Sequence, residues 1–331
     1  FFFVFPSKGT MTLSVKDCQA KLQEKKVDHR NWTGHLSKVH TVAWNNDGTR
    51  LASGSLDKTA RVWELQTDTK YGNPISHQLS GHTGPVDQLC WDPTNPNQLA
   101  SASSDKTVRL WDVRSSSSPC IVTINTIGEN INISWCPDGN YIAVGNKDDI
   151  ITVIDARKFK ATRIQKFNHE VNEFTWDNSG KYLFMTTELG TIEVFTHELK
   201  RLKSIHAHPS NIYCIEFDRS NKYFAVGSAD AIVSLFTLPE MICVRTFTKL
   251  ECPVRTISFS HDSSMITAAS EEPLIDISHT QTGEQVHQVH TNAPNNTVAW
   301  NPRDYILAYA GDEKDRYSDA GNIRLLRCGG V

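Results

Sequence analysis

Histidine, serine and aspartate recur in this sequence at spacings that could assemble a catalytic triad. One set contains His35, Ser53 and Asp57, followed by Trp63. The same residue types return at nearly the same spacing in His82, Ser101, Asp105 and Trp111. In a hydrolase, the aspartate would orient the histidine, which would take the proton from the serine nucleophile. Because catalysis needs one site and this set occurs twice, we expect neither set to be catalytic.

Other motifs for chemistry do not occur in the sequence. The patterns GxSxG, HExxH, GxxxxGK[ST] and GxGxxG are absent. His197 and Glu198 begin a zinc-protease motif, but Arg201 stands where its second histidine is needed. The eight cysteines are scattered without a CxxC pair, which argues against a zinc site and a disulfide framework. We expect a protein that is not an enzyme and has no cofactor, bound metal or small-molecule substrate.

Charge and hydropathy limit the setting in which the chain works. The net charge of −3 gives no global positive field that would attract nucleic acid. No apolar run approaches the roughly 18 residues of a membrane-spanning helix, and the apolar start Phe1–Phe5 lacks the features of a signal peptide. We expect no membrane association and a reducing compartment, the cytosol or the nucleus. Met11 is a candidate for the true start, which would leave Phe1–Thr10 as an extension.

The sequence is built from seven similar modules. Each module has a strand-like run that ends in a marker aromatic, and these markers are Trp44, Trp91, Trp135, Trp176, Phe217, Phe259 and Trp300. Successive markers lie 41 to 47 residues apart. Gly81-His82 and Trp111-Asp112 delimit the clearest module. This period and these dipeptides resemble the WD-repeat β-propeller family, in which each repeat forms a four-stranded blade. The resemblance implies an all-β fold, a seven-bladed WD-repeat β-propeller.

The two ends of the chain suggest how the ring closes. The last module ends its third strand at Ile323–Leu326 and leaves too few residues for a fourth. We expect Lys25–Gly34 to supply the missing outer strand, because closure hides an edge that would otherwise aggregate. The predicted domains are a disordered N-terminal extension over residues 1–22 and a propeller over residues 23–331.

The family resemblance also assigns the repeated polar residues. It implies buried His–Ser–Asp–Trp hydrogen-bond networks that join loops within a blade, here formed by His35, Ser53, Asp57, Trp63, His82, Ser101, Asp105 and Trp111. His208 and Asp230 occupy the same slots in the fifth module. Later modules depart from the pattern, for example with Phe167 in a histidine slot and Leu189 in an aspartate slot. Function often lies where local rules are broken, so we expect partners on blades three to seven.

Residues placed four positions before each marker aromatic are predicted to surround the upper opening of the ring. They are His40, Asp87, Ile131, Asn172, Tyr213, Arg255 and Asn296. Tyrosine and arginine are favoured at binding hot spots. We therefore predict that Tyr213 and Arg255 contact a protein partner, with His40, Asp87 and Asn172 as further candidates.

Basic residues gather in the outer strands expected for blades three and four. They are Arg157, Lys158, Lys160, Arg163, Lys166, Lys200, Arg201 and Lys203. These cations could contact RNA phosphates or an acidic partner. The favoured interpretation is that they blunt exposed strand edges. No aromatic stacking platform accompanies them, which weakens a direct role in RNA binding.

A narrower resemblance lies in seven sequence segments that the general repeat pattern does not describe. They are Gly128–Gly139, Ala143–Asp149, Phe167–Trp176, Val226–Phe236, Pro253–Asp262, Glu271–Ile277 and Ala308–Tyr317. These segments resemble the family of propeller subunits of the THO complex. The resemblance implies a nuclear scaffold that couples transcription, processing and splicing of mRNA to export within the TREX assembly. Its implied partners are the other THO subunits and mRNA export factors, with RNA reached through the complex.

Two alternative functions remain open from the sequence. Trp111–Arg114 is similar to the WDxR box by which some propellers dock on the adaptor of a cullin-RING ubiquitin ligase. The chain could then be a substrate receptor, and Arg114→Ala would abolish adaptor binding. The second alternative is a propeller that binds RNA directly through the basic strands, with affinity that falls steeply as salt rises.

Overall fold

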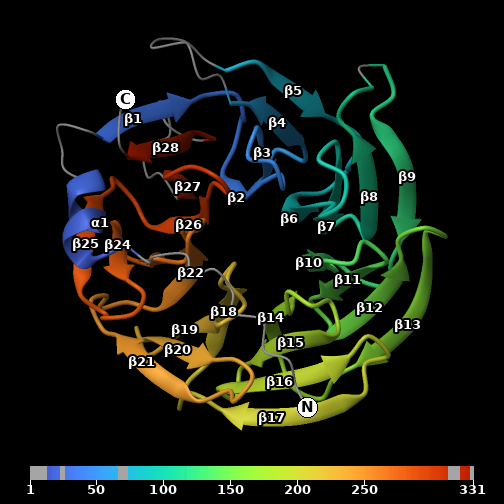
Figure 1. The fold of residues 1–331 in the computed structure, drawn as a ribbon. Helices are drawn as coiled ribbons and strands as arrows, with labels where there is room; N and C mark the ends of the chain where they lie inside the picture. The colour runs from blue at the N-terminus through green and yellow to red at the C-terminus, as the bar shows by residue number, and fades with distance from the viewer. Residues whose placement is uncertain (1–12, 23–26, 66–73, 116, 312–320, 329–331) are drawn as a thin grey trace, which may run out of the picture.

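The computed structural model describes residues 13–22, 27–65, 74–115, 117–311 and 321–328. These residues form one helix and twenty-eight strands, arranged in seven four-stranded antiparallel sheets. The sheets stand around a central axis like the blades of a propeller, as Figure 1 shows. The predicted fold class, an all-β seven-bladed propeller, is confirmed.

Each blade runs from the central channel to the outer rim. The inner strands of blades one to seven are β2 (Val39–Trp44), β6 (Val86–Trp91), β10 (Asn130–Trp135), β14 (Val171–Trp176), β18 (Ile212–Phe217), β22 (Val254–Phe259) and β26 (Asn295–Trp300). The second strands are β3 (Arg50–Ser55), β7 (Gln98–Ser103), β11 (Tyr141–Asn146), β15 (Tyr182–Thr187), β19 (Tyr223–Ser228), β23 (Met265–Ser270) and β27 (Ile306–Gly311). The third strands are β4 (Ala60–Glu64), β8 (Thr107–Asp112), β12 (Ile150–Asp155), β16 (Thr191–Thr196), β20 (Val233–Thr237), β24 (Leu274–His279) and β28 (Ile323–Cys328). The outer strands are β5 (Ser76–Leu79), β9 (Cys120–Asn125), β13 (Lys160–Lys166), β17 (Arg201–His206), β21 (Cys243–Phe247), β25 (Gln285–His290) and, completing blade seven, β1 (Val27–Trp32).

The second strand of each blade is rich in small residues because neighbouring blades cover both of its faces. In β3, Leu51, Ala52 and Ser53 have no exposed surface, and the equivalent residues of β7 are buried in the same way. A strand with a blade on either side is buried on both faces, so its sequence does not alternate between apolar and polar residues. Tight turns lead into these strands. Gly48 has a φ of +73°, a conformation that glycine adopts without steric cost.

Neighbouring blades are joined by apolar clusters and by the marker aromatics. The indole Nε1 of Trp44 donates to the carbonyl oxygen of Ala299 at 3.1 Å, which links blade one to blade seven. Trp91 donates in the same way to Ala43 at 2.9 Å, linking blade two to blade one. Trp176 also donates across a blade boundary, to Ser134, whereas Trp135 donates to Gly139 of its own blade. Several of the residues that mark the repeat in sequence therefore join successive blades.

The ring closes as the sequence predicts. Strand β1 pairs antiparallel with β28 along its whole length, from Val27 opposite Cys328 to Trp32 opposite Ile323. Trp32 is buried and stacks on Trp63 of blade one, with ring centroids 5.8 Å apart. The first two residues of the predicted segment, Lys25 and Lys26, lie outside the described residues.

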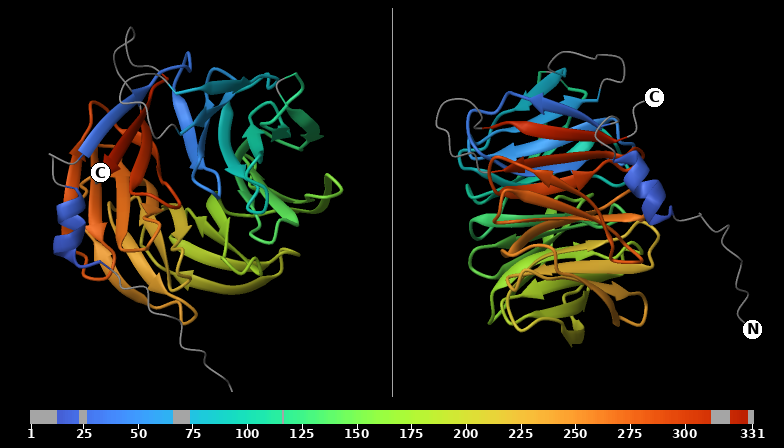
Figure 2. Two further views of the ribbon diagram at one scale, coloured as in Figure 1. Left: turned by 45° about the horizontal axis from the view of Figure 1, so that its top comes forward. Right: turned by 90° about the vertical axis from the view of Figure 1, so that its left-hand side faces the viewer.

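The N-terminal extension is where the structure corrects the sequence analysis. Helix α1 (Val15–Lys21) begins at a capping box in which Ser14 and Asp17 bond reciprocally. It lies on the rim beside β25 (Figures 1 and 2), where Cys18 and Leu22 are buried. The predicted disorder of residues 1–22 is therefore wrong from residue 13 onward. Residues 1–12, including the candidate start Met11, lie outside the described residues.

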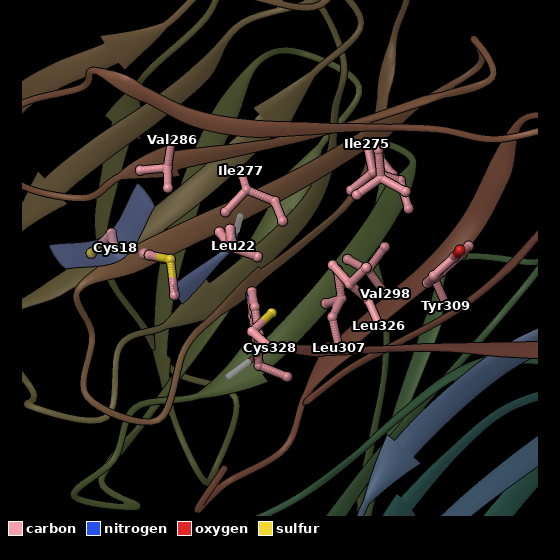
Figure 3. Close-up of a cluster of buried hydrophobic side chains, with 14 residues drawn as sticks. Cys18, Leu22, Ile275, Ile277, Val286, Val298, Leu307, Tyr309, Leu326 and Cys328 are labelled. Carbon is pink, nitrogen blue, oxygen red and sulfur yellow. The ribbon is translucent and has the colours of Figure 1, made fainter. Parts of the chain in front are cut away.

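The spacing of two apolar residues explains why this segment is helical. Cys18 and Leu22 are four positions apart and fall on one face of a helix. In Figure 3 they join a cluster between blades six and seven that includes Ile277, Leu326 and Cys328. Burial of these side chains, rather than helix propensity, stabilises a segment that is too short to be helical alone.

Candidate functional site

A β-bulge occurs at the same point of every inner strand. The register between the inner and second strands skips one residue in each blade, and the skipped residues are His40, Asp87, Ile131, Asn172, Tyr213, Arg255 and Asn296. A bulge leaves its residue unpaired and changes the direction of its side chain. These are the seven residues that the sequence analysis placed around the opening. We call them the bulge ring.

Neighbouring members of the bulge ring contact each other across blade boundaries. His40 Nδ1 lies 3.3 Å from Asp87 Oδ1. The guanidinium of Arg255 lies 4.6 Å from the centroid of the Tyr213 ring and also pairs with Glu271. Arg255 is exposed and Tyr213 is half-buried, so both present surface to a partner. The structure thus brings together the two residues that the sequence analysis singled out.

The inner strands enclose a channel below the bulge ring. Its cavity has a volume of about 580 Å³ and is lined by residues from all seven blades. Glu173 accepts hydrogen bonds from Gln88 Nε2 at 3.0 Å and from the backbone N–H of Phe174 at 3.1 Å. Burial raises the pKa of Glu173 to about 7 despite these bonds. The pattern of single acids within the inner strands is visible in the sequence, but the sequence analysis did not use it.

A second channel acid lies on blade five. Burial raises the pKa of Glu216 to about 8, and the charge of Arg219 only partly opposes this effect. Burial also lowers the pKa of the Arg219 guanidinium. Because the low-dielectric channel disfavours charge, these carboxyl groups hold protons near neutral pH. The channel therefore presents hydrogen-bonding groups with reduced charge.

The repeated polar sets form hydrogen-bond networks in blades one and two. In blade one, His35 Nδ1 lies 2.9 Å from Asp57 Oδ2, and His35 Nε2 lies 2.8 Å from Ser53 Oγ. Trp63 Nε1 donates to Ser53 Oγ at 2.8 Å. Because a carboxylate only accepts hydrogen bonds, Nδ1 carries the proton and Nε2 accepts from the serine hydroxyl. The serine is thus held between indole and imidazole, with no access for a substrate.

Blade two repeats this geometry closely. His82 lies 2.8 Å from both Asp105 Oδ2 and Ser101 Oγ, and Trp111 Nε1 donates to Ser101 Oγ at 2.8 Å. Burial lowers the pKa of His82, although Asp105 opposes this shift. For Asp105, burial favours a higher pKa, but hydrogen bonds from Thr107, Thr83 N–H and His82 outweigh it and lower the pKa to about 2. The histidine is kept neutral and the aspartate ionised, which suits a fixed network.

Blade five keeps only part of the network. His208 Nδ1 lies 2.9 Å from Asp230 Oδ2. Val226 and Phe236 occupy the serine and tryptophan slots, and His208 Nε2 has no hydrogen-bond partner among the described residues. Phe236 instead stacks on Phe224, with centroids 5.1 Å apart. Aromatic packing here replaces directed polar contacts.

Blade four replaces the network altogether. Phe167, in the histidine slot, packs edge-to-face on Phe195 at 5.4 Å. Leu189, in the aspartate slot, is exposed. Beside them the buried Glu193 accepts from Arg201 Nη1 at 3.3 Å, and His169 lies 3.9 Å from its other oxygen. This cluster has no local signature in the sequence, because its members come from different strands.

Five of the eight basic residues lie in the outer strands β13 and β17 of blades three and four. The other three, Arg157, Lys158 and Lys200, lie in the turns that precede these strands. Arg163 pairs with Val153, which packs between blades three and four. Lys203 pairs with Val194, which packs between blades four and five. Because side chains alternate along a strand, Arg163 and Lys203 face different grooves between blades. Arg201 pairs with Phe195, which packs in the same cluster as Val153, so it faces the same groove as Arg163. Arg201 is also held by Glu193, so the eight cations do not act as equivalent free charges.

Arg114 of the sequence WDVR is engaged within its own turn. Its guanidinium donates to both carboxylate oxygens of Asp112, from Nε at 2.9 Å and from Nη2 at 2.6 Å. An adaptor that recognises Arg114 would have to compete with this bidentate pair.

Metal coordination and membrane crossing have no support in the part of the chain that the structure describes. Within the ranges that the structure describes, no group of three or more His, Cys, Asp and Glu side chains could hold a metal ion. In the same ranges, no helix has the length and apolar character needed to cross a membrane. The contacts of Tyr213 with Arg255 and of His40 with Asp87 favour the surface of the bulge ring as the site, which can bind a partner through an aromatic ring, a cation and hydrogen-bonding side chains.

Comparison with known proteins identifies similar chains. The family model described as the THOC3 beta-propeller domain matches residues 35–310. The chain is 50% identical over 305 residues to THO complex subunit 3 of Arabidopsis thaliana, covering 91% of this chain and 96% of that protein. It is 36% identical to the WD repeat-containing protein AAC3 of Dictyostelium discoideum, covering 90% of this chain and 66% of that protein.

A solved structure has the same fold. The crystal structure of the Cps50 (Swd1) β-propeller domain of Myceliophteria thermophila matches with a TM-score of 0.77 and 17% identity, covering 91% of this chain and 98% of that chain. At this identity the match supports the propeller fold alone.

Proposed function

The chain belongs to the THOC3 β-propeller family, and from this premise we propose that it is a non-catalytic scaffold subunit of a THO complex in the nucleus. There it holds other protein subunits, and through them couples mRNA transcription and processing to export. The observation that carries the proposal is the identity to THO complex subunit 3 along nearly the whole of both chains.

The shape of the molecule suits a scaffold. Seven blades closed by β1 make a rigid disc whose upper face, lower face and rim can hold several partners at fixed angles. Fold alone does not name those partners. The bulge ring adds a specific surface, and we propose that Tyr213 and Arg255 bind a partner subunit there, with His40, Asp87 and Asn172 contributing.

RNA contact is proposed to be indirect. The net charge is −3, Lys203 faces a different groove from Arg163, and Arg201 is paired with Glu193. A direct RNA site needs several cations along one path, because each phosphate contact adds to affinity and to its salt dependence. We therefore expect the isolated chain to bind RNA weakly and its partners to carry the RNA.

Affinity purification tests the proposal. The tagged chain is recovered from nuclear extract, and the proteins that accompany it are identified by mass spectrometry. We expect the other THO subunits in stoichiometric amounts. Recovery of the chain without any of them, or with a ubiquitin ligase adaptor instead, would refute the scaffold role.

A pair of charge reversals tests the bulge ring. Arg255→Glu removes the cation from Tyr213 and places two acids beside each other, since Glu271 is its partner. Loss of a central arginine anchor should weaken assembly at least tenfold. Lys222→Glu is the control, because Lys222 is exposed in the turn after β18, at the other end of that strand. Equal assembly by both variants would exclude Arg255 from the interface.

A further inference from the structure

A second cavity lies between blades three and four, on the side of the disc that carries the bulge ring. Its volume is about 470 Å³. Ile131 and Asn172, two members of the bulge ring, line its wall, so the cavity is continuous with that surface. The two blades, β10 to β13 and β14 to β17, stand side by side in Figure 1. We call this cavity the blade 3/4 pocket.

Carboxylates outnumber cations in the wall of the blade 3/4 pocket. The charged and titratable residues of the wall are Asp149, Glu170, Glu188, Lys147 and His169. Lys147 Nζ is already paired with Glu129 Oε2 at 2.6 Å, and Asp149 accepts a backbone hydrogen bond at 3.1 Å. Glu170 and Glu188 are exposed, and neither side chain forms an ion pair or a hydrogen bond within the described residues. The charge left without a partner is therefore negative, and it complements a cation.

Blade four has two acids at a pair of positions where blades one to three, five and six have one or none. In each of these blades, a backbone hydrogen bond joins the turn after the second strand to the residue before the inner strand. In blade three this bond joins Lys147 to Glu129, whose side chains form the ion pair, and in blade four it joins Glu188 to Glu170. The pairs in blades one, two, five and six are Leu56 with Lys38, Ser104 with Pro85, Ala229 with Asn211 and Glu271 with Pro253. Because side chains at these two positions reach each other in blade three, a cation placed between Glu170 and Glu188 can contact both.

Amide groups in the same wall lack hydrogen-bond partners. Asn146 is 5% exposed and its Oδ1 accepts from two backbone N–H groups, but its Nδ2 has no partner in the part of the chain that the structure describes. The same holds for the buried Nδ2 of Asn172 and for Nε2 of His169, which lies 3.9 Å from Oε2 of the buried Glu193. An amide nitrogen donates, so both asparagines suit a carbonyl oxygen. A peptide that contains lysine or arginine offers a carbonyl oxygen and a cation together.

We propose that the blade 3/4 pocket binds a basic peptide segment of another THO subunit. A lysine or arginine of that segment pairs with Glu170 and Glu188, as Lys147 pairs with Glu129 in blade three, and a backbone carbonyl oxygen accepts from Asn172. RNA does not fit this wall, because its phosphates would meet carboxylates. The inference rests on the proposed function, since it names the chemistry of the partner at one part of the surface assigned to subunit binding.

Reconstitution with the purified remaining THO subunits, free of RNA, tests the pocket. The dissociation constant is measured for the wild-type chain, Glu188→Lys, Glu188→Gln and Glu240→Lys. Glu188→Lys places an ammonium beside Glu170, as in blade three, so it occupies the site from within and repels the cation of the partner. We expect it to weaken binding at least tenfold, and Glu188→Gln to weaken it several-fold at low salt and less at high salt.

Glu240→Lys is the matched control, because it makes the same change of charge on an exposed glutamate. Glu240 lies in the turn between β20 and β21, and β20 starts level with the bulge ring and ends at this turn. We expect this variant to bind like the wild-type chain. Urea unfolding curves establish that each variant keeps the fold.

The outcomes separate this inference from the proposed function. If the wild-type chain assembles and Glu188→Lys binds equally well, or if Glu240→Lys is just as defective, the pocket is not the docking site and the scaffold role stands. If the wild-type chain does not assemble, both fail. A photocrosslinker in place of Asn168, an exposed residue of the pocket wall, should attach to a subunit segment that contains lysine or arginine. Attachment to a segment without a basic residue, or to RNA in the whole complex, would overturn the assignment.

Discussion

Removal of the Ser53 hydroxyl should destabilise the propeller by about 2–6 kcal/mol, although the change deletes a single oxygen atom. The hydroxyl accepts from Trp63 Nε1 and donates to His35 Nε2, both at 2.8 Å. Trp63 and His35 are buried. In Ser53→Ala both nitrogen atoms lose their partners without gaining water. Each unsatisfied buried group costs about 1–3 kcal/mol, which gives the combined figure.

Urea unfolding followed by tryptophan fluorescence measures this effect. Ser101→Ala in blade two should cost the same amount, because its bonds to His82 and Trp111 have the same lengths. His208→Ala should cost less than His35→Ala, since His208 bonds only through Nδ1 in the described structure. The two serine variants lie in different blades, so their effects should add.

The result that would refute the reasoning is specific. A change below about 0.5 kcal/mol for Ser53→Ala would mean that the buried nitrogen atoms find other partners or water, so that the network does not stabilise the blade. Equal costs for His35→Ala and His208→Ala would show that bonds to serine and tryptophan add nothing beyond the His–Asp pair.

Three further predictions concern buried groups. Glu173→Gln and Glu216→Gln should flatten the pH dependence of the urea midpoint. The pKa values of these carboxyl groups in the folded chain, about 7 and about 8, exceed those in the unfolded chain, so wild-type stability should fall as pH rises from about 4.5 through 8. An unchanged slope in the variants would contradict this. Asp105→Asn should lower stability at pH 7 but not near pH 2. A carboxyl whose pKa is lowered by folding contributes stability above its unfolded pKa of about 3.9, and this contribution is lost as pH falls through about 2. A difference in stability that persists at pH 2 would point to another cause. Leu22→Ala should weaken docking of α1 by about 2–5 kcal/mol, because Leu22 is buried in the cluster between blades six and seven. The effect should be seen as faster proteolysis after Lys21, with little change in the unfolding of the propeller. Unchanged proteolysis would mean that Leu22 does not hold the helix.

The repeat made the fold predictable to the level of single strands. Trp44 and Trp91 mark the period and also form the contacts between blades, so the sequence signal and the physical cause coincide. The same register located the bulge ring, because a residue four positions before each marker falls at the bulge. The contact of Tyr213 with Arg255 was not predictable in detail, since it joins two blades and depends on side-chain conformation.

Features outside the repeat left weaker signals. Helix α1 contains two buried residues, Cys18 and Leu22, and this is too few to show helical periodicity against the background of the chain. Arg201 was counted with the other cations because its partner Glu193 lies on the adjacent strand, eight positions earlier. Pairing across strands depends on register, and only the structure fixes which side of the blade each residue faces.

The polar networks differ from blade to blade. In blades one and two, directed hydrogen bonds fix the loops that carry His35 and His82. In blades four and five, Phe195 and Phe236 stabilise the same region through aromatic packing. Aromatic packing holds the blade core without specifying polar groups on the loops above it. Loop positions such as Leu189 are therefore free to differ from the repeat and to become exposed. Exposed apolar side chains also occur on blade one, where Leu36 and Leu56 are 87% and 46% exposed. The blades therefore differ in the packing below their loops, and exposure alone does not distinguish blades four and five from the first two.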